Sequence, residues 1–127
     1  VVVLDMDRLK VINDTLGHAA GDLALKTLAK RLQGACRDSD VVARLGGDEF
    51  ALVFPRLGEG THGEDLVQDL ARKVAGPLAY KATVLELGAS VGLALYPRDG
   101  EDPDTLLKAA DEAMYRMKRD RRVERQI

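Results

Sequence analysis

Residues 44–50 read Arg44-Leu45-Gly46-Gly47-Asp48-Glu49-Phe50, and the rest of the chain can be interpreted around this stretch. An apolar segment at 41–45 precedes the two glycines, and a second one at 50–54 follows the two acids. Two strand-like runs joined by a glycine-rich corner predict a β-hairpin. The glycines can adopt positive φ and leave room for a bulky group near the backbone. We therefore expect the two acids at the tip of a rigid element.

Composition narrows the class of protein. The chain has 127 residues, of which 46% are hydrophobic and 31% charged, which is typical of one globular domain. A net charge of −2 gives no electrostatic reason to expect a nucleic acid polymer as partner. Cys36, the single cysteine, predicts a buried thiol in a reducing compartment. No apolar run approaches the roughly 20 residues that span a bilayer. We expect a cytoplasmic domain, alone or within a larger, membrane-tethered protein.

The periodicity of the chain predicts alternating helices and strands. Apolar runs predict strands at 1–4, 41–45, 50–54, 78–87 and 89–96, with 1–4 and 50–54 central in the sheet. Helical spacing predicts a short helix near 9–12 and longer ones at 22–36, 64–75 and from 103, the last capped by Asp102. Turn-forming residues predict breaks at 13–22 and a mobile loop at 56–63. This order predicts an α+β fold (an α/β sandwich) in which helices flank one central, mostly antiparallel sheet.

Three carboxylates form the candidate site: Asp5 at the end of the first strand, and Asp48 and Glu49 at the hairpin tip. If these strands are neighbours, the carboxylates converge and repel one another unless a cation joins them. Mg²⁺ prefers one or two carboxylates together with substrate phosphates, and two such ions about 4 Å apart would clamp an in-line phosphoryl or nucleotidyl displacement. The alternative is a solvated acidic hairpin tip, with Asp5 or Asp7 capping the next turn.

Residues 44–50 also resemble the motif that names the GGDEF family, the diguanylate cyclases. Residues 5–14 (DMDRLKVIND) resemble the family's D-x-D-x-F-K-x-x-N-D segment, and the pairs at 17–18 (GH) and 21–22 (GD) follow at its spacing. Residues 90–94 (SVGLA) resemble its S-x-G-x-A strand, and residues 110–118 resemble its A-D-x-A-x-Y-x-x-K helix. The similarity covers nearly all of the chain. It implies a fold similar to class III nucleotide cyclases and polymerase palm domains.

The resemblance implies catalytic and metal-binding roles. Asp5, the backbone carbonyl of Met6 and Asp48 would hold Mg²⁺, with Mn²⁺ as the alternative ion. Asp48 would also orient or deprotonate the attacking 3′-hydroxyl, and Glu49 would support the metal or the developing charge.

Further positions would bind substrate. Phosphates would be met by cations and by backbone amides at 7–10, and guanine by a carboxylate that adenine would leave unpaired. The implied substrate-binding residues are Lys10, Asn13, Asp22, Gly46, Gly47, Lys118 and Arg122. The structural alternatives are turn and cap roles for Asn13 and Asp22, and complementation of a helix dipole by Lys118 and Arg122.

The implied reaction joins two GTP molecules into cyclic di-GMP with release of two pyrophosphates. Each chain would hold one GTP, so a homodimer is required. Arg37 and Asp40 resemble the family's R-x-x-D site, at which cyclic di-GMP would bind and inhibit; an ordinary surface salt bridge is the alternative.

Some features depart from the family pattern. Leu9 stands where Phe is usual, Arg121 and Val123 replace Gly and Asn, and the family's upstream L-T-G-L-x-N-R helical segment is lacking. We expect the natural protein to extend upstream, with a fused sensor or regulatory domain. The alternative function is a non-catalytic receptor domain for GTP or cyclic di-GMP. Use of ATP is disfavoured by Asn13 and Asp22.

Overall fold

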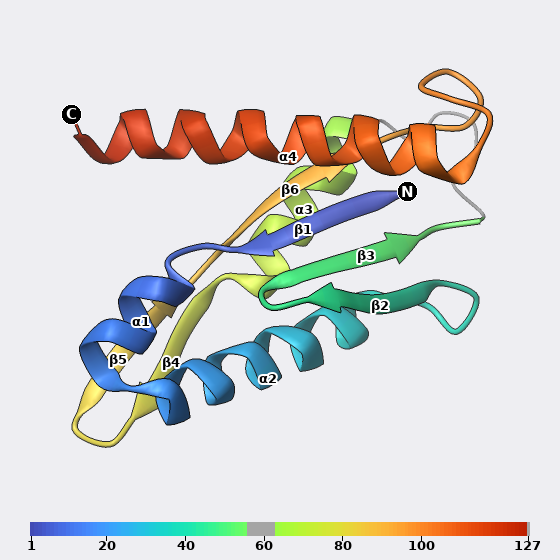
Figure 1. The fold of residues 1–127 in the computed structure, drawn as a ribbon. Helices are drawn as coiled ribbons and strands as arrows, with labels where there is room; N and C mark the ends of the chain where they lie inside the picture. Colours follow the sequence, from blue (N-terminus) through green and yellow to red (C-terminus); the bar gives the residue numbers. More distant parts are fainter. Residues whose placement is uncertain (56–62, 127) are drawn as a thin grey trace.

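The computed structural model describes residues 1–55 and 63–126, and of residues 64 and 121–126 it describes the backbone only. The chain forms six strands and four helices within these residues (Figure 1). The strands are β1 (Val2–Met6), β2 (Val41–Gly46), β3 (Glu49–Val53), β4 (Gly76–Tyr80), β5 (Thr83–Leu87) and β6 (Ala89–Leu93). The helices are α1 (Leu9–Leu16), α2 (His18–Ala35), α3 (Gly63–Val74) and α4 (Pro103–Gln126).

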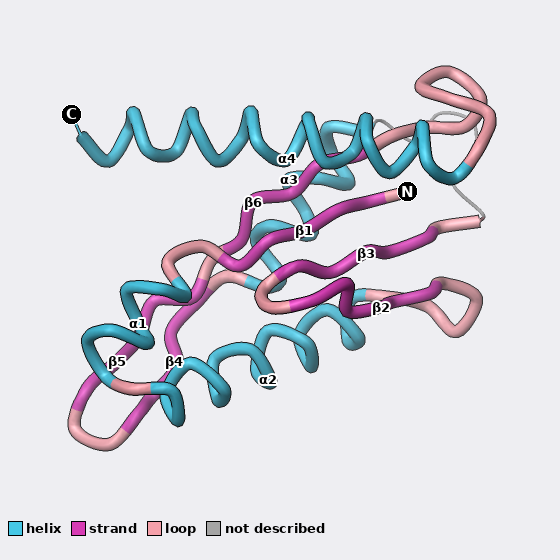
Figure 2. The backbone as a smooth tube through the Cα atoms, viewed as in Figure 1, coloured by secondary structure: helices cyan, strands magenta, loops and turns pink. Residues whose placement is uncertain are grey.

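The main sheet has the strand order β2-β3-β1-β6, and every pairing in it is antiparallel. The strands predicted to be central, β1 and β3, are indeed the inner pair. The main sheet is the predicted central antiparallel sheet; strands β4 and β5, whose residues were expected to belong to it, form a separate two-stranded sheet. Figure 2 shows this second hairpin extending beyond the main sheet.

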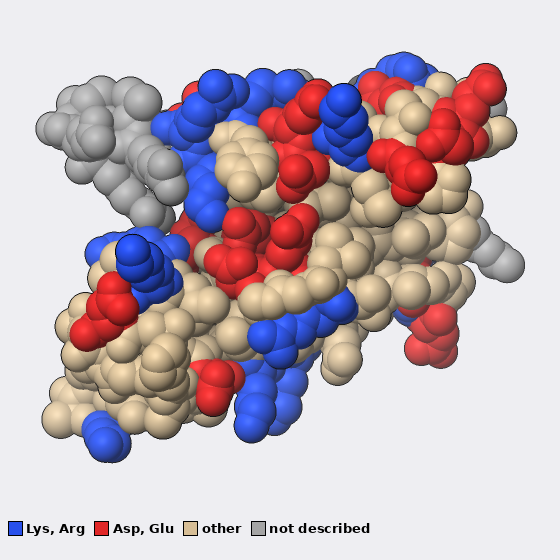
Figure 3. Space-filling view, in the orientation of Figure 1, with Lys and Arg blue, Asp and Glu red and all other residues tan. Residues whose placement is uncertain are grey.

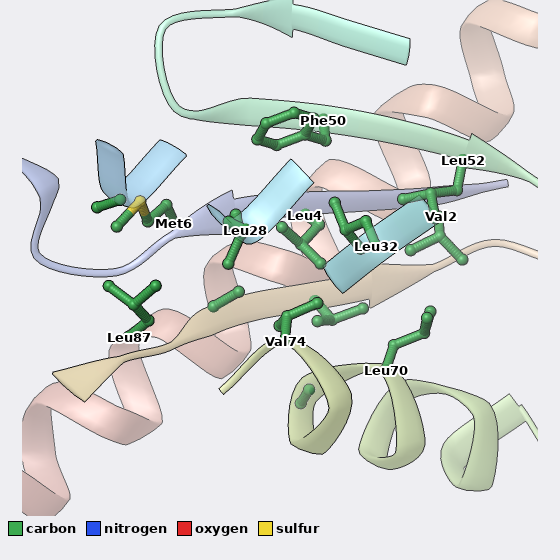
Figure 4. Close-up of a cluster of buried hydrophobic side chains, with 14 of the residues drawn as sticks. Val2, Leu4, Met6, Leu28, Leu32, Phe50, Leu52, Leu70, Val74 and Leu87 are labelled. Atoms are coloured by element: carbon green, nitrogen blue, oxygen red, sulfur yellow. The ribbon is translucent and has the colours of Figure 1, made fainter. Parts of the chain in front are cut away.

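Helices cover both faces of the main sheet, which gives the predicted sandwich. Alternation along β1 sends Val2, Leu4 and Met6 into a core with α2 and α3, where Leu28 and Leu70 meet them (Figure 4). The opposite face of β1 meets α4 through a smaller cluster. This second cluster consists of Val3, Ala94, Leu106, Ala110 and Met114. Asp5 has the same parity as Val3, so its side chain faces α4.

Close contact between β6 and α4 depends on a glycine. A Cβ built on Gly92 would lie 2.0 Å from the carbonyl oxygen of Ala110 and 2.3 Å from the amide nitrogen of Met114. The backbone of α4 therefore rests directly on β6. As predicted, Asp102 caps this helix: the amide of Thr105 donates to its Oδ1 at 2.9 Å.

Several predicted boundaries were wrong. Helix α2 begins at His18, not residue 22, and α1 runs to Leu16, so most of the predicted break at 13–22 is helical. The strand predicted at 78–87 is the β4–β5 hairpin, which turns at Lys81 with φ 51°. Strand β6 ends at Leu93, three residues before the predicted end. The loop predicted at 56–63 lies outside the described residues, apart from Gly63 at the start of α3.

Candidate functional site

Three acids meet where β1 ends and β3 begins. Asp5 pairs with Glu49 across the β1–β3 ladder, and the amide of Met6 donates to the carbonyl oxygen of Asp48 at 3.0 Å. The side chain of Asp48 lies close enough to Asp5 to perturb its ionisation. The convergence expected from the sequence is therefore present. Figure 3 shows acidic side chains gathered on this face, with basic side chains on either side.

Asp5 is the most constrained of these acids. Lys118 Nζ on α4 donates to Asp5 Oδ2 at 2.8 Å, and the two side chains are only 22% and 12% exposed. Asp5 Oδ1 is buried and has no hydrogen-bond partner among the described residues. Burial raises the pKa of Asp5 to about 6; the hydrogen bond from Lys118 opposes this rise, and Asp48 adds to it. For Lys118, burial lowers the pKa, but attraction to Asp5 and its neighbours outweighs burial and raises it overall.

Glu49 shares its surroundings with an acid that the sequence analysis did not single out. Burial raises the pKa of Glu49, and the nearby carboxylates of Asp111 and Asp48 raise it further. Asp111 lies on α4 seven residues before Lys118, on the same side of the helix. The corner therefore carries an excess of negative charge, which Lys118 offsets in part.

The glycine corner is held by Arg44. Its Nε and Nη2 both donate to the carbonyl oxygen of Gly47, at 3.0 and 2.6 Å. Gly47 has φ 43°, a left-handed conformation that a side chain would strain, and the ladder is irregular between Arg44 and Gly46. No role for Arg44 was predicted from the sequence. In the sequence, only the position of Arg44 three residues before Gly47 indicates that it can hold the corner.

Asp7 is buried, and the residue after it occupies the N-cap position of α1, so Asp7 is not the N-cap residue. Its Oδ1 accepts a hydrogen bond from Ser90 Oγ at 2.8 Å, and its amide donates to the carbonyl of Gly88 at 2.9 Å. The N-cap position of α1 belongs to Arg8, with φ 64° and no side-chain cap. These two bonds fix the turn that follows Met6. The hydrogen bond between Ser90 and Asp7 was also not predicted from the sequence.

The residues expected to read guanine lie where α1 meets α2. Asn13 packs so closely on Gly21 that a Cβ there would overlap its amide group, and Asp22 follows directly. Asp22 also lines a pocket of about 140 Å³ together with Leu25, Lys26, Ala29, Arg44 and Phe50. The pocket is therefore lined by both α2 and the β2–β3 hairpin. Lys10 is exposed on α1, and the side chain of Arg122 lies outside the described residues.

Arg37 and Asp40 form a tight turn before β2. Asp40 Oδ2 accepts from the amide of Arg37 at 2.8 Å, and the amide of Asp40 donates to the carbonyl of Arg37 at 2.9 Å. Within the described residues the guanidinium of Arg37 forms no ion pair, so the surface salt bridge weighed as an alternative is not formed.

One observation favours a hard divalent cation at the acidic corner formed by Asp5, Asp48 and Glu49. Asp5 Oδ1 is buried there and has no hydrogen-bond partner among the described residues. Asp48 and the Met6 carbonyl would complete a small oxygen donor set. The described residues contain no cluster of three or more His, Cys, Asp or Glu side chains arranged as metal ligands. Phosphate oxygens or water would therefore have to supply the other ligands.

The chain belongs to the class of antiparallel α+β domains that carry acids at the ends of their central strands. Comparison with known proteins identifies the family within this class. The family model described as "Diguanylate cyclase, GGDEF domain" matches residues 1–124, so the chain belongs to the GGDEF family. Among curated relatives, the diguanylate cyclase TpbB of Pseudomonas aeruginosa is 41% identical over 128 residues, covering 100% of this chain and 29% of TpbB. The cyclic di-GMP phosphodiesterase NbdA of the same species is 45% identical over 118 residues, covering 93% of this chain and 15% of NbdA. The chain thus spans less than a third of either relative.

Solved structures share the fold. A sensory box/GGDEF family protein from Caulobacter crescentus matches with a TM-score of 0.84 at 38% identity, over 94% of this chain and 77% of that one. The GGDEF domain of DgcB from the same species, solved in complex with c-di-GMP, matches with a TM-score of 0.78 at 29% identity, over 94% and 71%. None of the described helices is both long and apolar enough to cross a bilayer.

Proposed function

We propose that this chain is a diguanylate cyclase domain that condenses two GTP molecules into cyclic di-GMP and two pyrophosphates. The observation that supports this most is the meeting of Asp5, Asp48 and Glu49 beside Lys118. Membership of a family that includes TpbB supports the same activity. In a longer protein, an upstream sensor domain would regulate the reaction, and the domain would work in the cytoplasm.

The chain's own residues would position the reactants. Asp5, Asp48 and the Met6 carbonyl would hold Mg²⁺, which when bound neutralises triphosphate charge. Asp48 would accept the proton of the attacking 3′-hydroxyl, and Glu49 would support the charge that develops there. The main contribution to the rate would be alignment of the hydroxyl with the α-phosphate of the other nucleotide.

Substrate binding would use the surrounding elements. Lys10, Lys118 and Arg122 would bind the triphosphate, together with the amides at the start of α1. Asn13 and Asp22 would bind the guanine edge, at the junction of α1 and α2. Gly46 and Gly47 would let the nucleotide approach the hairpin backbone.

The test is product analysis on a form dimerised by a fused coiled coil. With GTP and Mg²⁺ the wild type is expected to make cyclic di-GMP, and Asp48→Ala to lower the rate by at least about a hundredfold. Asp65→Ala is the matched control, since Asp65 is exposed on α3, across the sheet from α4. A dimerised wild type that binds GTP yet forms no cyclic di-GMP would support the second candidate, a receptor domain. That candidate has support of its own, because NbdA, named as a phosphodiesterase, carries the same region.

We also propose that Arg37 and Asp40 bind the product and that binding inhibits the enzyme. The guanidinium of Arg37 is exposed and forms no ion pair with the described residues, so it can stack on a guanine base and bind phosphate. The DgcB complex shows that a related GGDEF domain binds c-di-GMP.

This second proposal predicts the effect of added cyclic di-GMP on the initial rate. Arg37→Ala is expected to raise the concentration needed for half-inhibition roughly tenfold or more, because a charge-assisted contact is lost. Asp38→Ala, in the same loop, serves as control and should behave as wild type. Equal inhibition of Arg37→Ala and wild type would rule out this site.

A further inference from the structure

The ion pair between Lys118 and Asp5 differs from the other ion pairs of the described residues. Those pairs join exposed or half-exposed side chains close in sequence, on α3 or in the loop at 98–99. Lys118 and Asp5 are 113 residues apart, are largely shielded from water, and connect α4 to β1 at the acidic corner. Screening is weak at such a position, so the pair has a larger effect on the site than a surface pair would have.

Lys118 pairs with only part of the negative charge at the acidic corner. It hydrogen-bonds one oxygen of Asp5, while the other is buried without a partner. Asp48 lies beside the pair, and both Asp5 and Asp48 attract the ammonium group. One positive charge therefore faces two carboxylates, and a buried carboxylate with an unused oxygen is a costly arrangement.

The backbone near Lys118 is fixed, but its side chain can move. Met114 is buried against β1, and the amide of Val91 donates to Met117 Sδ at 3.2 Å, so this part of α4 is anchored to the sheet. The lysine side chain is a flexible four-carbon stem with a point charge at its end. Its ammonium group can leave Asp5 for a nearby anion without any movement of the helix.

We propose that Lys118 is an internal counter-ion that holds Asp5 while the site is empty, then releases it and turns to the triphosphate when a metal–nucleotide complex binds. This inference rests on the function proposed above, because it assumes a divalent cation at Asp5. Lys118 would then oppose the binding of the metal alone and favour the binding of the metal with its nucleotide. The two effects have opposite signs, so they can be separated by experiment.

The experiment measures Mg²⁺ binding in the absence of nucleotide, by calorimetric titration and by the shift in Tm. Lys118→Met is expected to bind Mg²⁺ alone roughly tenfold more tightly than wild type, with a lower metal-free Tm and a larger Mg²⁺-induced rise. The same variant is expected to bind the Mg²⁺ complex of an unreactive GTP analogue more weakly. Lys118→Arg keeps the positive charge and should stay within about twofold of wild type for Mg²⁺ alone. Lys108→Met, exposed on the same helix, controls for the loss of one charge.

Two results would overturn the proposal: Mg²⁺ affinity that is unchanged or lower in Lys118→Met, or Mg²⁺ and nucleotide affinities that shift in the same direction. If Lys118→Met does not fold without metal, the comparison of Lys118→Arg with wild type still decides, since a Mg²⁺ response well above wild type in that variant contradicts the proposal. Failure of the proposed function would show differently, as no cyclic di-GMP from the dimerised wild type. The titration with Mg²⁺ alone does not depend on that result.

Discussion

The Asp5 side chain lies beside a second carboxylate in a shielded corner, so protons and cations compete for it. With a pKa of about 6 against an ordinary value of 3.8, Asp5 holds its proton in the folded protein over a range where the unfolded chain has lost it. The folded state binds more protons in that range, so the free energy of unfolding of the metal-free protein falls as pH rises from about 4 to about 6. Above this range Asp5 is ionised in both the folded and the unfolded state, so its destabilising contribution no longer changes with pH.

Mg²⁺ should reverse this loss, because it binds the carboxylate that the proton leaves. We expect the Mg²⁺-induced rise in Tm to be small at pH 5 and to grow through pH 6 to a plateau above pH 7. The measurement is the difference in Tm with and without Mg²⁺ at each pH, in which other titrating groups largely cancel. Asp48→Asn should show a smaller rise at every pH. A Mg²⁺-induced rise that does not vary between pH 5 and 8 would contradict the assignment of Asp5 as ligand.

The separate residues of the site differed in how far the sequence could predict them. The meeting of Asp5 and Asp48 was predictable, because both lie at the ends of apolar strands and neighbouring central strands bring their ends together. The bond from Ser90 to Asp7 spans 83 residues, and that from Lys118 to Asp5 spans 113. Such pairs depend on the register of β6 and on the placement of α4, which local patterns do not contain.

Among the elements, α4 brings Lys118 and Asp111 to the candidate site, and its distance from β6 is set at Gly92. Gly92→Ala would drive a methyl group into the backbone of α4, so we expect a loss of about 3 kcal/mol or more in the free energy of unfolding. Cyclase activity should fall further than stability explains, because Lys118 moves with the helix. Denaturant unfolding and product formation measure the two effects.

Gly34→Ala is the matched control for this prediction. Gly34 is an exposed helical residue on α2, and nothing lies within 4 Å of a Cβ built there. Alanine favours a helix over glycine, so this variant should gain about 0.5–1 kcal/mol. Equal effects of the two substitutions would mean that α4 does not rest on β6 as described.

Element types were predictable where one period dominated, and boundaries were not where tertiary contacts override local preference. Helix α2 begins four residues earlier than expected. Gly21, which was expected to end a helix, lies inside α2 because its lack of a side chain lets Asn13 pack against it. The β4–β5 hairpin was read as one strand because its turn contains Lys81 and Ala82 instead of glycine, proline or asparagine. Strand β2 has an apolar sequence and was predicted without a place in the sheet; Val41 and Leu45 are 56% and 52% exposed, because β2 is an edge strand.

At the scale of the whole molecule, the candidate site lies on one face and at one end of the central strands. Val1 lies at the other end of β1 (Figure 1), where its backbone nitrogen donates to the carbonyl oxygen of Ala94 at 2.9 Å. The proposed reaction joins two nucleotides, and one set of Asp5, Asp48 and Lys118 can serve one of them. Under the proposed function, the second nucleotide would come from a second copy of the chain whose site faces the first.

This requirement predicts how wild type and Asp48→Ala behave when mixed in dimers that form at random. Cyclic di-GMP needs two bonds, each made with the hydroxyl held at one of the two sites, so a mixed dimer with one inactive site cannot close the ring. At constant total protein, an equal mixture should therefore give about a quarter of the wild-type rate of cyclic product, since only wild-type pairs complete it. A rate of about half would mean that each chain works independently. A mixture of wild type with Asp65→Ala should keep the full rate, and linear dinucleotide should accumulate only with Asp48→Ala, because its mixed dimers still make one bond.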